Sequence, residues 1–516
     1  MLATPPTSYG AQAPGTPEGA TLRQRFEAAI PAAAKLTLLH EAALDLVAAS
    51  VAGTLSEAEQ PPSQALTQWL FFRAGAVSRF SRVELRSASS PDEADRLMNE
   101  LASHLQPSVG RESYGIARFQ RGSSVSLAVV FGRRPLDVEP FPKSFAPGSK
   151  LTLHLKASEG FTDFQLHADA PGGGVTTVKG TGDAGAVTLE HQLPTQPGRY
   201  FIEVSALDPR LSSAAPENPW RRSLLWVPVY VGAAENAAPD DFIGGPNEGK
   251  AADAATWGTR VAEVYDKARV AAGKKPLAVD GRVTALAQDK SGQAARAGRE
   301  PGPDATLPDK LAATGWPPRD YDEQLARGDS PVEWATLRLL QPLARSRITG
   351  PDALLIGVGL TARPPAAGSP ASPGLVEYAV VEELLEPAGK LEVERDRTKV
   401  LAALAAGPER AGKGAFNKDD DVSKAIQDFA LEVCKGIKKP NQTKTLIDKV
   451  RGVGSKYHSW GNAIWRSGYD FTRWGEQSIL TKAKEEPLPY AAVGLCQGDL
   501  PGKPGGSYVV VVQYGP

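Results

Sequence analysis

The sequence predicts an α+β multidomain protein, in which three divergent copies of one helix-and-hairpin unit accompany one all-β sandwich. One order of elements, a long Ala-rich helix followed by a shorter helix and a closing β-hairpin, occurs three times along the 516 residues. Such internal repetition indicates a repeated structural unit. One further segment contains only short alternating strands between Pro/Gly turns, which is typical of a β-sandwich. A hydrophobic content of 41% is sufficient for several packed cores.

The long helix of each copy is amphipathic and ends at a glycine. Its apolar residues recur at three- and four-residue spacing, which predicts a helix with one buried face, and the glycine predicts a left-handed C-cap. A shorter helix, which also ends near a glycine, follows each long one. The long helices are expected at 36–53, 283–298 and 422–436, and the short ones at 65–76, 307–316 and 445–454.

Each copy closes with two apolar, β-branched runs that flank a Gly/Ser turn, the sequence form of a β-hairpin. In the first two copies, a helix that starts with Ser-Pro and has Glu at its third position precedes the hairpin, at 90–105 and 330–345. The third copy has an aromatic-rich stretch, 457–474, in its place. The hairpins are expected at 114–132, 354–384 and 490–515.

The segment between the first two copies has no helical pattern and predicts an antiparallel β-sandwich. Its phrase PGRYFIEVSA, 197–206, resembles the late strands of immunoglobulin-like or macroglobulin-like sandwiches. A polar Ala/Asn/Asp/Gly/Pro stretch after it predicts a linker. The expected boundaries are a flexible N-terminal segment at 1–20, module 1 at 21–134, the sandwich at 135–232, the linker at 233–255, module 2 at 256–388 and module 3 at 389–516.

The middle copy resembles the CAP superfamily, the SCP-like proteins that include cysteine-rich secretory, antigen 5 and PR-1 proteins. Its opening, Val261–Ser291, is similar to the family's first helix, Gly…Pro-Leu segment and Ala-rich second helix. Its later part, Arg319–Leu360, follows the family's order: an acidic region, a helix with Trp, a Ser-Pro-x-His-Arg turn, then Gly-Val-Gly opening a strand. Through the repeat, the resemblance extends to Leu22–Arg134 and Glu392–Pro516. It implies three degenerate CAP-like α-β-α sandwiches in a mostly secreted family.

Charge and hydropathy exclude several classes of partner. The formal net charge is −1, so nothing steers the chain toward nucleic acid or an anionic membrane. No run of about 20 apolar residues occurs, so no membrane-spanning helix is expected. The segment Met1–Gly19 lacks the apolar centre of a signal peptide. Either the protein stays in the cytoplasm or its signal peptide is absent from this sequence, and the family resemblance favours the second.

The cleft of CAP proteins carries two His and two acidic residues that can hold a divalent metal, and module 2 lacks the imidazoles. Glu323, or Asp322 beside it, matches an acidic position, but Ala344 stands where the second His belongs. No histidine occurs between His191 and His458. We therefore expect no His-based metal site and no cofactor here. A single acidic residue such as Glu323, without a His partner, is most often exposed to solvent or ion-paired.

Module 1 carries three vestigial cleft candidates. His104 falls at the position of Ala344, by the register of the Ser-Pro helix, and Glu84 and Glu93 are the candidate acids. The partner of His104 is missing, and a single His on an amphipathic helix is more often packed or exposed than a ligand. These residues, or Glu323 with Asp322, would have to form the acid/base pair of an enzyme.

Module 3 contains the densest aromatic stretch of the chain. Such a stripe usually belongs to a core, but Trp and Tyr beside Arg also form contact anchors or sugar-stacking platforms. The candidate binding residues are Trp460, Trp465, Tyr469, Arg473 and Trp474.

Two further features of module 3 each leave two interpretations open. Cys434 and Cys496, the two cysteines of the chain, form either one disulfide or two buried thiols. The run NKDDD, Asn417–Asp421, either binds calcium or is the solvated acidic start of a helix. It lacks the alternating ligand spacing of an EF-hand.

These features predict a non-catalytic extracytoplasmic protein, a binding or scaffold protein of the bacterial cell envelope whose CAP-like modules have lost the His-based site. The resemblance implies a protein, glycan or lipid of the envelope as partner, and self-assembly also fits. Two alternatives stay open: a hydrolase-type enzyme that uses cleft carboxylates, and a calcium-dependent adhesin.

Overall fold

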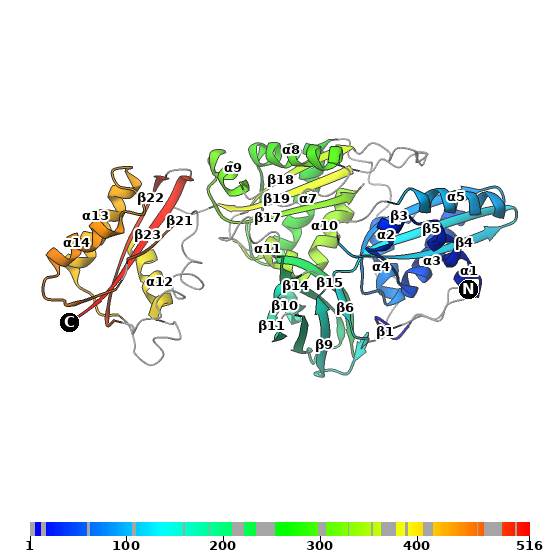
Figure 1. The fold of residues 1–516 in the computed structure, drawn as a ribbon, viewed down its shortest axis with the longest axis horizontal. Helices are drawn as coiled ribbons and strands as arrows, with labels where there is room; N and C mark the ends of the chain where they lie inside the picture. The colour runs from blue at the N-terminus through cyan, green and yellow to red at the C-terminus, as the bar shows by residue number, and fades with distance from the viewer. Residues whose placement is uncertain are drawn as a thin grey trace. The chain divides into compact units, whose positions relative to one another are not determined.

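The structure, a computed structural model, is a mixed α/β protein with several sheets (Figure 1). Contacts divide the chain into two units. The first is Met1–Ala252, Glu263–Lys274 and Gly328–Gly350, and the second is Asp253–Ala262, Lys275–Arg327 and Pro351–Pro516. No helix among the described residues is long and apolar enough to cross a membrane. The described residues are 6–11, 17–58, 62–105, 110–157, 160–183, 185–208, 221–233, 253–297, 306–328, 330–351, 354–362, 378–387, 391–405, 416–461, 463–468, 488–500 and 503–516.

The first unit begins with a four-stranded sheet covered by helices on both faces. Its strand order is β2-β4-β5-β3, and β2 runs parallel to β4 while the other pairs are antiparallel. Helices α1, α2 and α5 pack on one face, and α3 and α4 on the other. The elements are α1 (Pro17–Ala29), α2 (Ala32–Lys35), β2 (Leu38–His40), α3 (Ala42–Ala58), α4 (Gln64–Ala74), β3 (Arg79–Ala88), α5 (Pro91–Ser103), β4 (Glu112–Arg121) and β5 (Ser124–Arg133).

The β-sandwich of the first unit consists of two facing sheets, β11-β10-β14-β15-β8 and β12-β13-β9-β6. A short pair, β1 (Ser8–Tyr9) with β7 (Phe141–Pro142), lies beside them. The remaining elements are β6 (Leu136–Val138), β8 (Ser144–Phe145), β9 (Lys150–Ala157), β10 (Thr162–Asp169), η1 (Pro171–Gly173), β11 (Val175–Lys179), β12 (Thr181–Asp183), β13 (Ala186–Gln192), β14 (Gly198–Leu207) and β15 (Arg221–Val231).

Helix α4 joins the first sheet and the sandwich into one core. Its sequence, QALTQWLFFRA, is apolar around most of its circumference, which is typical of a helix buried on several sides. The ring of Phe72 lies 5.0 Å from Trp226 and 6.2 Å from Phe201 of the sandwich. One hydrophobic cluster therefore runs from α3 and α4 through both sheets of the sandwich.

Two helices, α10 (Pro331–Leu340) and α11 (Pro342–Thr349), also belong to the first unit. The sequence predicted one helix over 330–345, but the chain breaks at Gln341 because Pro342 has no N–H to continue the first helix. Helix α10 contacts α4, and α11 contacts β10, β11 and β14. The carboxylate of Glu333 accepts a hydrogen bond from Ala65 N, at 2.6 Å, and so binds the N-terminal end of α4.

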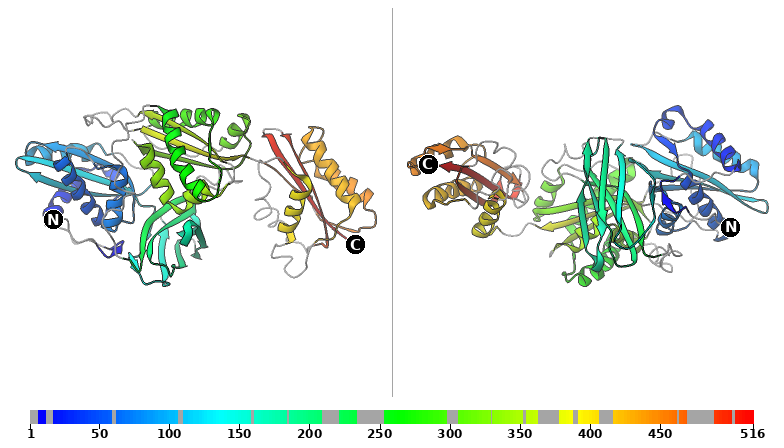
Figure 2. Two further views of the ribbon diagram at one scale, coloured as in Figure 1. Left: turned by 180° about the vertical axis from the view of Figure 1, so that it is seen from behind. Right: turned by 90° about the horizontal axis from the view of Figure 1, so that it is seen from below.

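The second unit contains two further sheets with helices packed on them. One has the order β16-β18-β19-β17, and α8 and α9 follow its edge strand. The other is the long β22–β23 hairpin with β20 and β21; α13 and α14 lie on one face and α12 on the other (Figures 1 and 2). The elements are α7 (Ala254–Ala271), whose first part lies here, β16 (Ala278–Val279), α8 (Gly281–Ala297), α9 (Leu307–Ala313), β17 (Pro318–Gly328), β18 (Leu355–Ala362), β19 (Tyr378–Pro387), α12 (Val393–Ala405), α13 (Asp420–Cys434), α14 (Thr443–Val453), β20 (Ser459–Trp460), β21 (Ile464–Gly468), β22 (Tyr490–Leu500) and β23 (Lys503–Gly515).

The three helix-covered sheets share one strand order. A short edge segment runs parallel to the first hairpin strand, the second hairpin strand follows, and the strand after the short helix closes the sheet. In module 3 the edge segment is a single bridge, Asn417 to Tyr490. In each sheet a glycine of the first hairpin strand lies against the backbone of the long helix: an added Cβ would lie 2.1–2.4 Å from that backbone at Gly115, Gly357, Gly359 and Gly494.

A side chain of each long helix covers the free edge of that same strand. Beyond the short edge segment the strand has unpaired N–H and C=O groups, which would otherwise be a site for aberrant pairing. The side-chain oxygens of Asp45, Gln288 and Gln427 accept hydrogen bonds from the N–H groups of Ile116, Leu360 and Leu495, at 2.9, 2.9 and 3.1 Å. Each residue that donates its N–H directly follows one of these glycines, so close packing and edge protection occur at the same place.

Substitution of Gly494 by alanine is expected to destabilise module 3 by about 1–3 kcal/mol, because the new Cβ would lie 2.4 Å from Ile426 O. Hydrogen exchange of the β22 amides measures this change. Gly452 in α14 is the matched control, since a Cβ there meets open space, and G452A should stabilise by up to about 1 kcal/mol. Equal effects of the two substitutions would contradict the proposed close contact.

The first predicted long helix has wrong boundaries at both ends. The helix expected at 36–53 begins at Ala42, and residues Leu38–His40 form the edge strand β2 instead. The helix also continues past Gly53 to Ala58, so this glycine is no C-cap. The ring of Phe119 lies 3.7 Å from the place of a Gly53 Cβ, an ordinary van der Waals distance.

Candidate functional site

The turn that carries Ala344 is packed against the sandwich. Ala344 lies on α11 and is 3% exposed. The N–H of Leu343, beside it, donates to Oε2 of Glu203 at 2.8 Å, and Glu203 is 1% exposed. Arg345 forms an ion pair with Asp169. Both polar groups that flank Ala344 are thus used in holding α11 to β10 and β14.

Glu323, the matched acidic residue of module 2, is buried and paired. It lies on β17 and forms an ion pair with Lys290 of α8, and both residues are less than a tenth exposed. Its Oε2 is buried without a hydrogen-bond partner. Asp322, the neighbouring carboxylate, accepts a hydrogen bond from Gln324 Nε2 at 3.1 Å. Within the described ranges no group of three or more His, Cys, Asp and Glu residues could hold a metal ion.

The three candidates of module 1 do not form one site. Glu93 lies in the first turn of α5 and His104 caps its last turn, so eleven residues at 1.5 Å each separate them by about 16 Å. Hydrogen bonds from the Ser89 hydroxyl and N–H hold the pKa of Glu93 below its ordinary value, as expected of a helix-capping carboxylate. His104 is exposed and contacts Glu100 O. Glu84, on β3, lies 3.7 Å from Arg86.

A polar network around His40 was missed by the sequence analysis. His40 Nε2 lies 2.8 Å from Asp45 Oδ2, and its Nδ1 lies 3.2 Å from Arg23 Nη1. Tyr114 packs edge-on against the imidazole and donates to Glu27 at 2.7 Å. Both ring nitrogens are engaged and Asp45 also holds the strand edge, so the network ties α1, β2, α3 and β4 together. No local pattern around His40 distinguishes it from an ordinary helix-flanking residue.

The polar face beneath α11 was also missed. Residues His167, Glu203 and Ser205 lie on the outer face of β10 and β14, and all three are less than 5% exposed. His167 Nε2 lies 2.8 Å from Ser205 Oγ, and its Nδ1 lies 3.0 Å from Thr177 Oγ1. Burial, with Arg221 and Arg347 nearby, lowers the pKa of His167 to about 4. Alternating polar residues in a strand normally predict a solvated face, which here is covered.

Two of the five candidate aromatic-site residues pack against the core of module 3. Trp460 stacks on Tyr514 at 5.3 Å and donates through Nε1 to Tyr457 O. Trp465 packs on Tyr508 at 6.2 Å, and both tryptophans are partly buried. Tyr469, Arg473 and Trp474 lie outside the described residues. The described part of this stripe therefore provides packing to the sheet.

The acidic run Asn417–Asp421 marks a helix start. Asp419 is the N-cap of α13 and accepts hydrogen bonds from the N–H groups of Asp421 and Val422. Lys456, at 2.7 Å, and Tyr457 also donate to it, and together they lower its pKa to about 2, with Lys456 the largest cause. The carboxylate oxygens of Asp419 are thus taken by protein donors.

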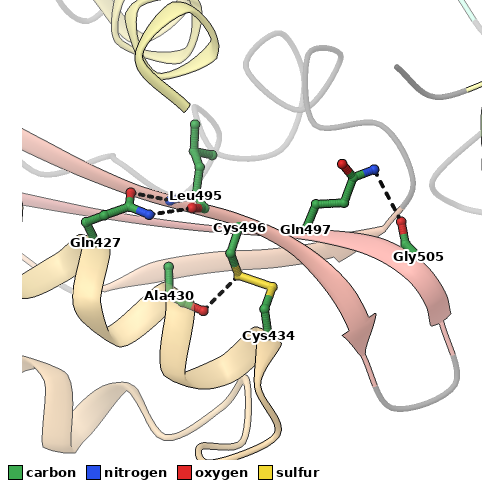
Figure 3. The surroundings of a disulfide bond; sticks show 7 residues. All are labelled: Gln427, Ala430, Cys434, Leu495, Cys496, Gln497 and Gly505. Carbon is green, nitrogen blue, oxygen red and sulfur yellow. Dashed lines mark hydrogen bonds between the residues drawn. A yellow bond between two sulfur atoms is a disulfide. The ribbon is translucent and has the colours of Figure 1, made fainter. Parts of the chain in front are cut away.

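Cys434 and Cys496 are joined by a disulfide that links the end of α13 to β22 (Figure 3). Cys496 is 2% exposed. In Figure 3 the amide of Gln427 faces the backbone of Leu495, one residue before Cys496, with hydrogen bonds of 2.6 and 3.1 Å. The disulfide and the edge-covering amide therefore hold the same stretch of β22 to the same helix.

A small hollow lies in module 1, beside Arg82, Glu112 and Phe131. Its empty volume is about 190 Å³, part of which is open to solvent. Pockets that enclose a metabolite usually measure about 300–1,000 Å³. This hollow is smaller than such pockets.

Comparison with known proteins gives only a distant similarity. No protein-family profile matches the chain, and none of the curated proteins does. Several solved structures match, including the following two. The first is an extracellular protein with an SCP domain from Bacillus anthracis: identity 10%, TM-score 0.20, covering 46% of this chain and 67% of that one. The second is a cysteine-rich secretory protein from Staphylococcus aureus: identity 11%, TM-score 0.20, covering 63% of this chain and 91% of that one. A TM-score of 0.20 is too low to establish a shared fold.

Proposed function

We propose that this chain is a non-catalytic extracytoplasmic protein, a binding or scaffold protein of the bacterial cell envelope built from three CAP-like modules and an immunoglobulin-like sandwich. The observation that carries the proposal is the turn of Ala344. In a CAP protein the corresponding turn presents a His to a cleft. Here it presents a buried alanine, and its N–H and its arginine are bound by Glu203 and Asp169 of the sandwich.

The pairing of Glu323 supports the same proposal. A general acid or base needs a group that can exchange a proton with substrate, and a ligand-holding carboxylate needs its charge available. The ammonium group of Lys290 compensates the charge of Glu323 inside the helix–sheet interface. This side chain therefore serves packing, and the hydrolase alternative has no assembled acid/base pair among the candidates.

An extracytoplasmic location fits the disulfide. Disulfides form and persist in oxidising compartments, whereas cytoplasmic thiols are kept reduced. The bond between Cys434 and Cys496 closes a loop of 62 residues, as a structural disulfide does. The proposed partner is a protein, glycan or lipid of the envelope, in line with the resemblance to CAP proteins.

The location is tested by alkylating thiols in intact cells that express the protein from its native gene. We expect Cys434 and Cys496 to resist a maleimide in denatured samples until a reductant is added, because both sulfurs are bonded. We also expect the protein to fractionate with envelope or secreted markers. Full alkylation of both cysteines without reductant, in a cytoplasmic fraction, would overturn the proposed location.

A further inference from the structure

We propose that helix α11 is an acid-released latch, which closes over the polar face of the sandwich at neutral pH and leaves it when His167 gains a proton. This inference does not depend on the proposed function. It rests on the chemistry of one interface within the first unit: the outer face of β10 and β14, and the helix that covers it.

The covered face is polar. His167 and Glu203 are register partners on adjacent strands, and Ser205 follows on β14. The imidazole lies between two hydroxyl groups, those of Thr177 and Ser205, so one ring nitrogen donates and the other accepts. His167 is 4% exposed. A neutral imidazole satisfies both hydroxyls without any buried charge on the ring.

Hydrogen bonds with charged groups help to hold the helix to this face. Leu343 N donates to Glu203, and Arg345 pairs with Asp169, whose other oxygen accepts from Phe201 N at 2.9 Å. The Nε1 of Trp226 donates to Leu340 O just before the helix, at 3.2 Å. An interface of this kind depends on the charge balance of the groups it buries, more than an apolar contact of the same size would.

The charged groups around His167 come from every element packed on it. Arg347 on α11 and Arg221 on β15 act on it as cations, and Arg221 is itself ion-paired with Asp163 of β10. Two carboxylates lie nearby. Glu203 accepts a hydrogen bond from Leu343 N, and Asp169 binds Arg345 and Phe201 N. A proton on His167 would add a third cation to a desolvated site whose carboxylates already have partners. Separation of α11 removes Arg347 and admits water.

The direction of the pH effect follows from the two states. With the latch closed, the pKa of His167 is lowered to about 4; with it open, the imidazole returns toward its ordinary value of about 6.5. The open state therefore binds the proton more tightly, and opening becomes more favourable as the pH falls from about 6.5 to about 4. Between pH 7.5 and pH 5.0 the opening equilibrium should rise by about 30-fold.

Hydrogen exchange of the full chain tests the latch. The amides of α11, Pro342–Thr349, should lose protection by about 30-fold at pH 5.0 relative to pH 7.5, after correction for intrinsic exchange rates. In H167Q the amide side chain keeps partners for Thr177 and Ser205 but cannot titrate, so the change should shrink to less than about 3-fold. The exposed His104 is the control, and H104Q should behave as the unsubstituted protein.

Two outcomes would overturn the proposal. One is an equal loss of protection in H167Q, which would assign the acid effect to Glu203 or Asp169. The other is an absence of any pH effect on α11 in the unsubstituted chain. If H167Q fails to fold, R347Q provides the second variant: without that cation the acid effect should be smaller than in the unsubstituted protein, and an unchanged effect would contradict the latch.

Discussion

Replacement of Lys290 by methionine, with Glu323 left in place, is expected to lower the free energy of unfolding of module 2 by about 3–5 kcal/mol. The substitution preserves most of the apolar stem of Lys290 but removes the ammonium group, so a carboxylate less than a tenth exposed would lose its ion-pair partner. One oxygen of that carboxylate already has no hydrogen-bond partner, which leaves little to compensate the loss.

The double variant K290M/E323L separates the cost of the unpaired charge from the worth of the pair. The attraction within a buried ion pair is often little larger than the cost of desolvating the two charges. We therefore expect the double variant, with an apolar pair of similar volume, to be as stable as the unsubstituted protein or more stable by about 1–4 kcal/mol. Hydrogen exchange of the β17–β19 amides, or urea unfolding resolved for this module, measures both variants. The exposed pair Lys424–Asp428 in α13 is the matched control, and K424M should change stability by less than about 0.5 kcal/mol.

A further variant, E323Q, tests the enzyme alternative. If Glu323 served catalysis, E323Q would remove an activity while leaving the fold at least as stable. If Glu323 serves packing, E323Q should destabilise the module, because Lys290 would then be the buried charge without a partner. A single K290M variant as stable as the unsubstituted protein would contradict the structural role of the pair.

Much of the fold follows from local patterns. The hairpins fall close to the predicted ranges because apolar β-branched runs on either side of a Gly/Ser turn have few other ways to satisfy their backbone groups. The Ser-Pro starts at Ser90 and Ser330 are observed N-caps with Pro at the first helical position. These signals act over three or four residues, so a single sequence contains them in full.

The partners of the candidate site residues cannot be predicted from local sequence patterns, because they come from distant parts of the chain. Lys290 has the spacing of an ordinary helix residue, and only the position of β17 makes it the partner of Glu323. His167 alternates with apolar neighbours as a solvated residue would, and only the arrival of α11, 180 residues later in the chain, covers it. The Ser-Pro start at Ser330 predicts one helix that includes Pro342. In the structure the missing N–H of Pro342 divides this segment into two helices.

In each of the three sheets, glycines in the first hairpin strand are the sequence signal of a close contact between helix and strand. They are conspicuous in the sequence as YGI, GVG and VGL, and each lies where the long helix touches its strand. The same helices place Asp45, Gln288 and Gln427 over the next residue of the strand. A helix that approaches a sheet this closely leaves no room for a ligand at the point of contact.

Removal of the disulfide is the second change with a large expected effect. The bond between Cys434 and Cys496 spans 62 residues, and loss of a cross-link of that length costs about 4 kcal/mol in the chain-entropy model. The variant C434A/C496A should therefore lower the stability of module 3 by roughly this amount, measured as loss of amide protection in α13 and β22. Gln427 should retain part of the contact, because it binds Leu495 independently of the sulfurs.

The location of the loss distinguishes this effect from a general weakening. The cross-linked loop contains α14 and β21 as well as the two bonded elements, so protection should fall there and remain unchanged in the sandwich strands β9 and β13. A reductant should reproduce the effect in the unsubstituted protein and have no effect on the variant. If the reduced protein and the variant both keep full protection in β22, the helix–strand contact is maintained without the disulfide, and the disulfide has no measurable part in the stability of the module.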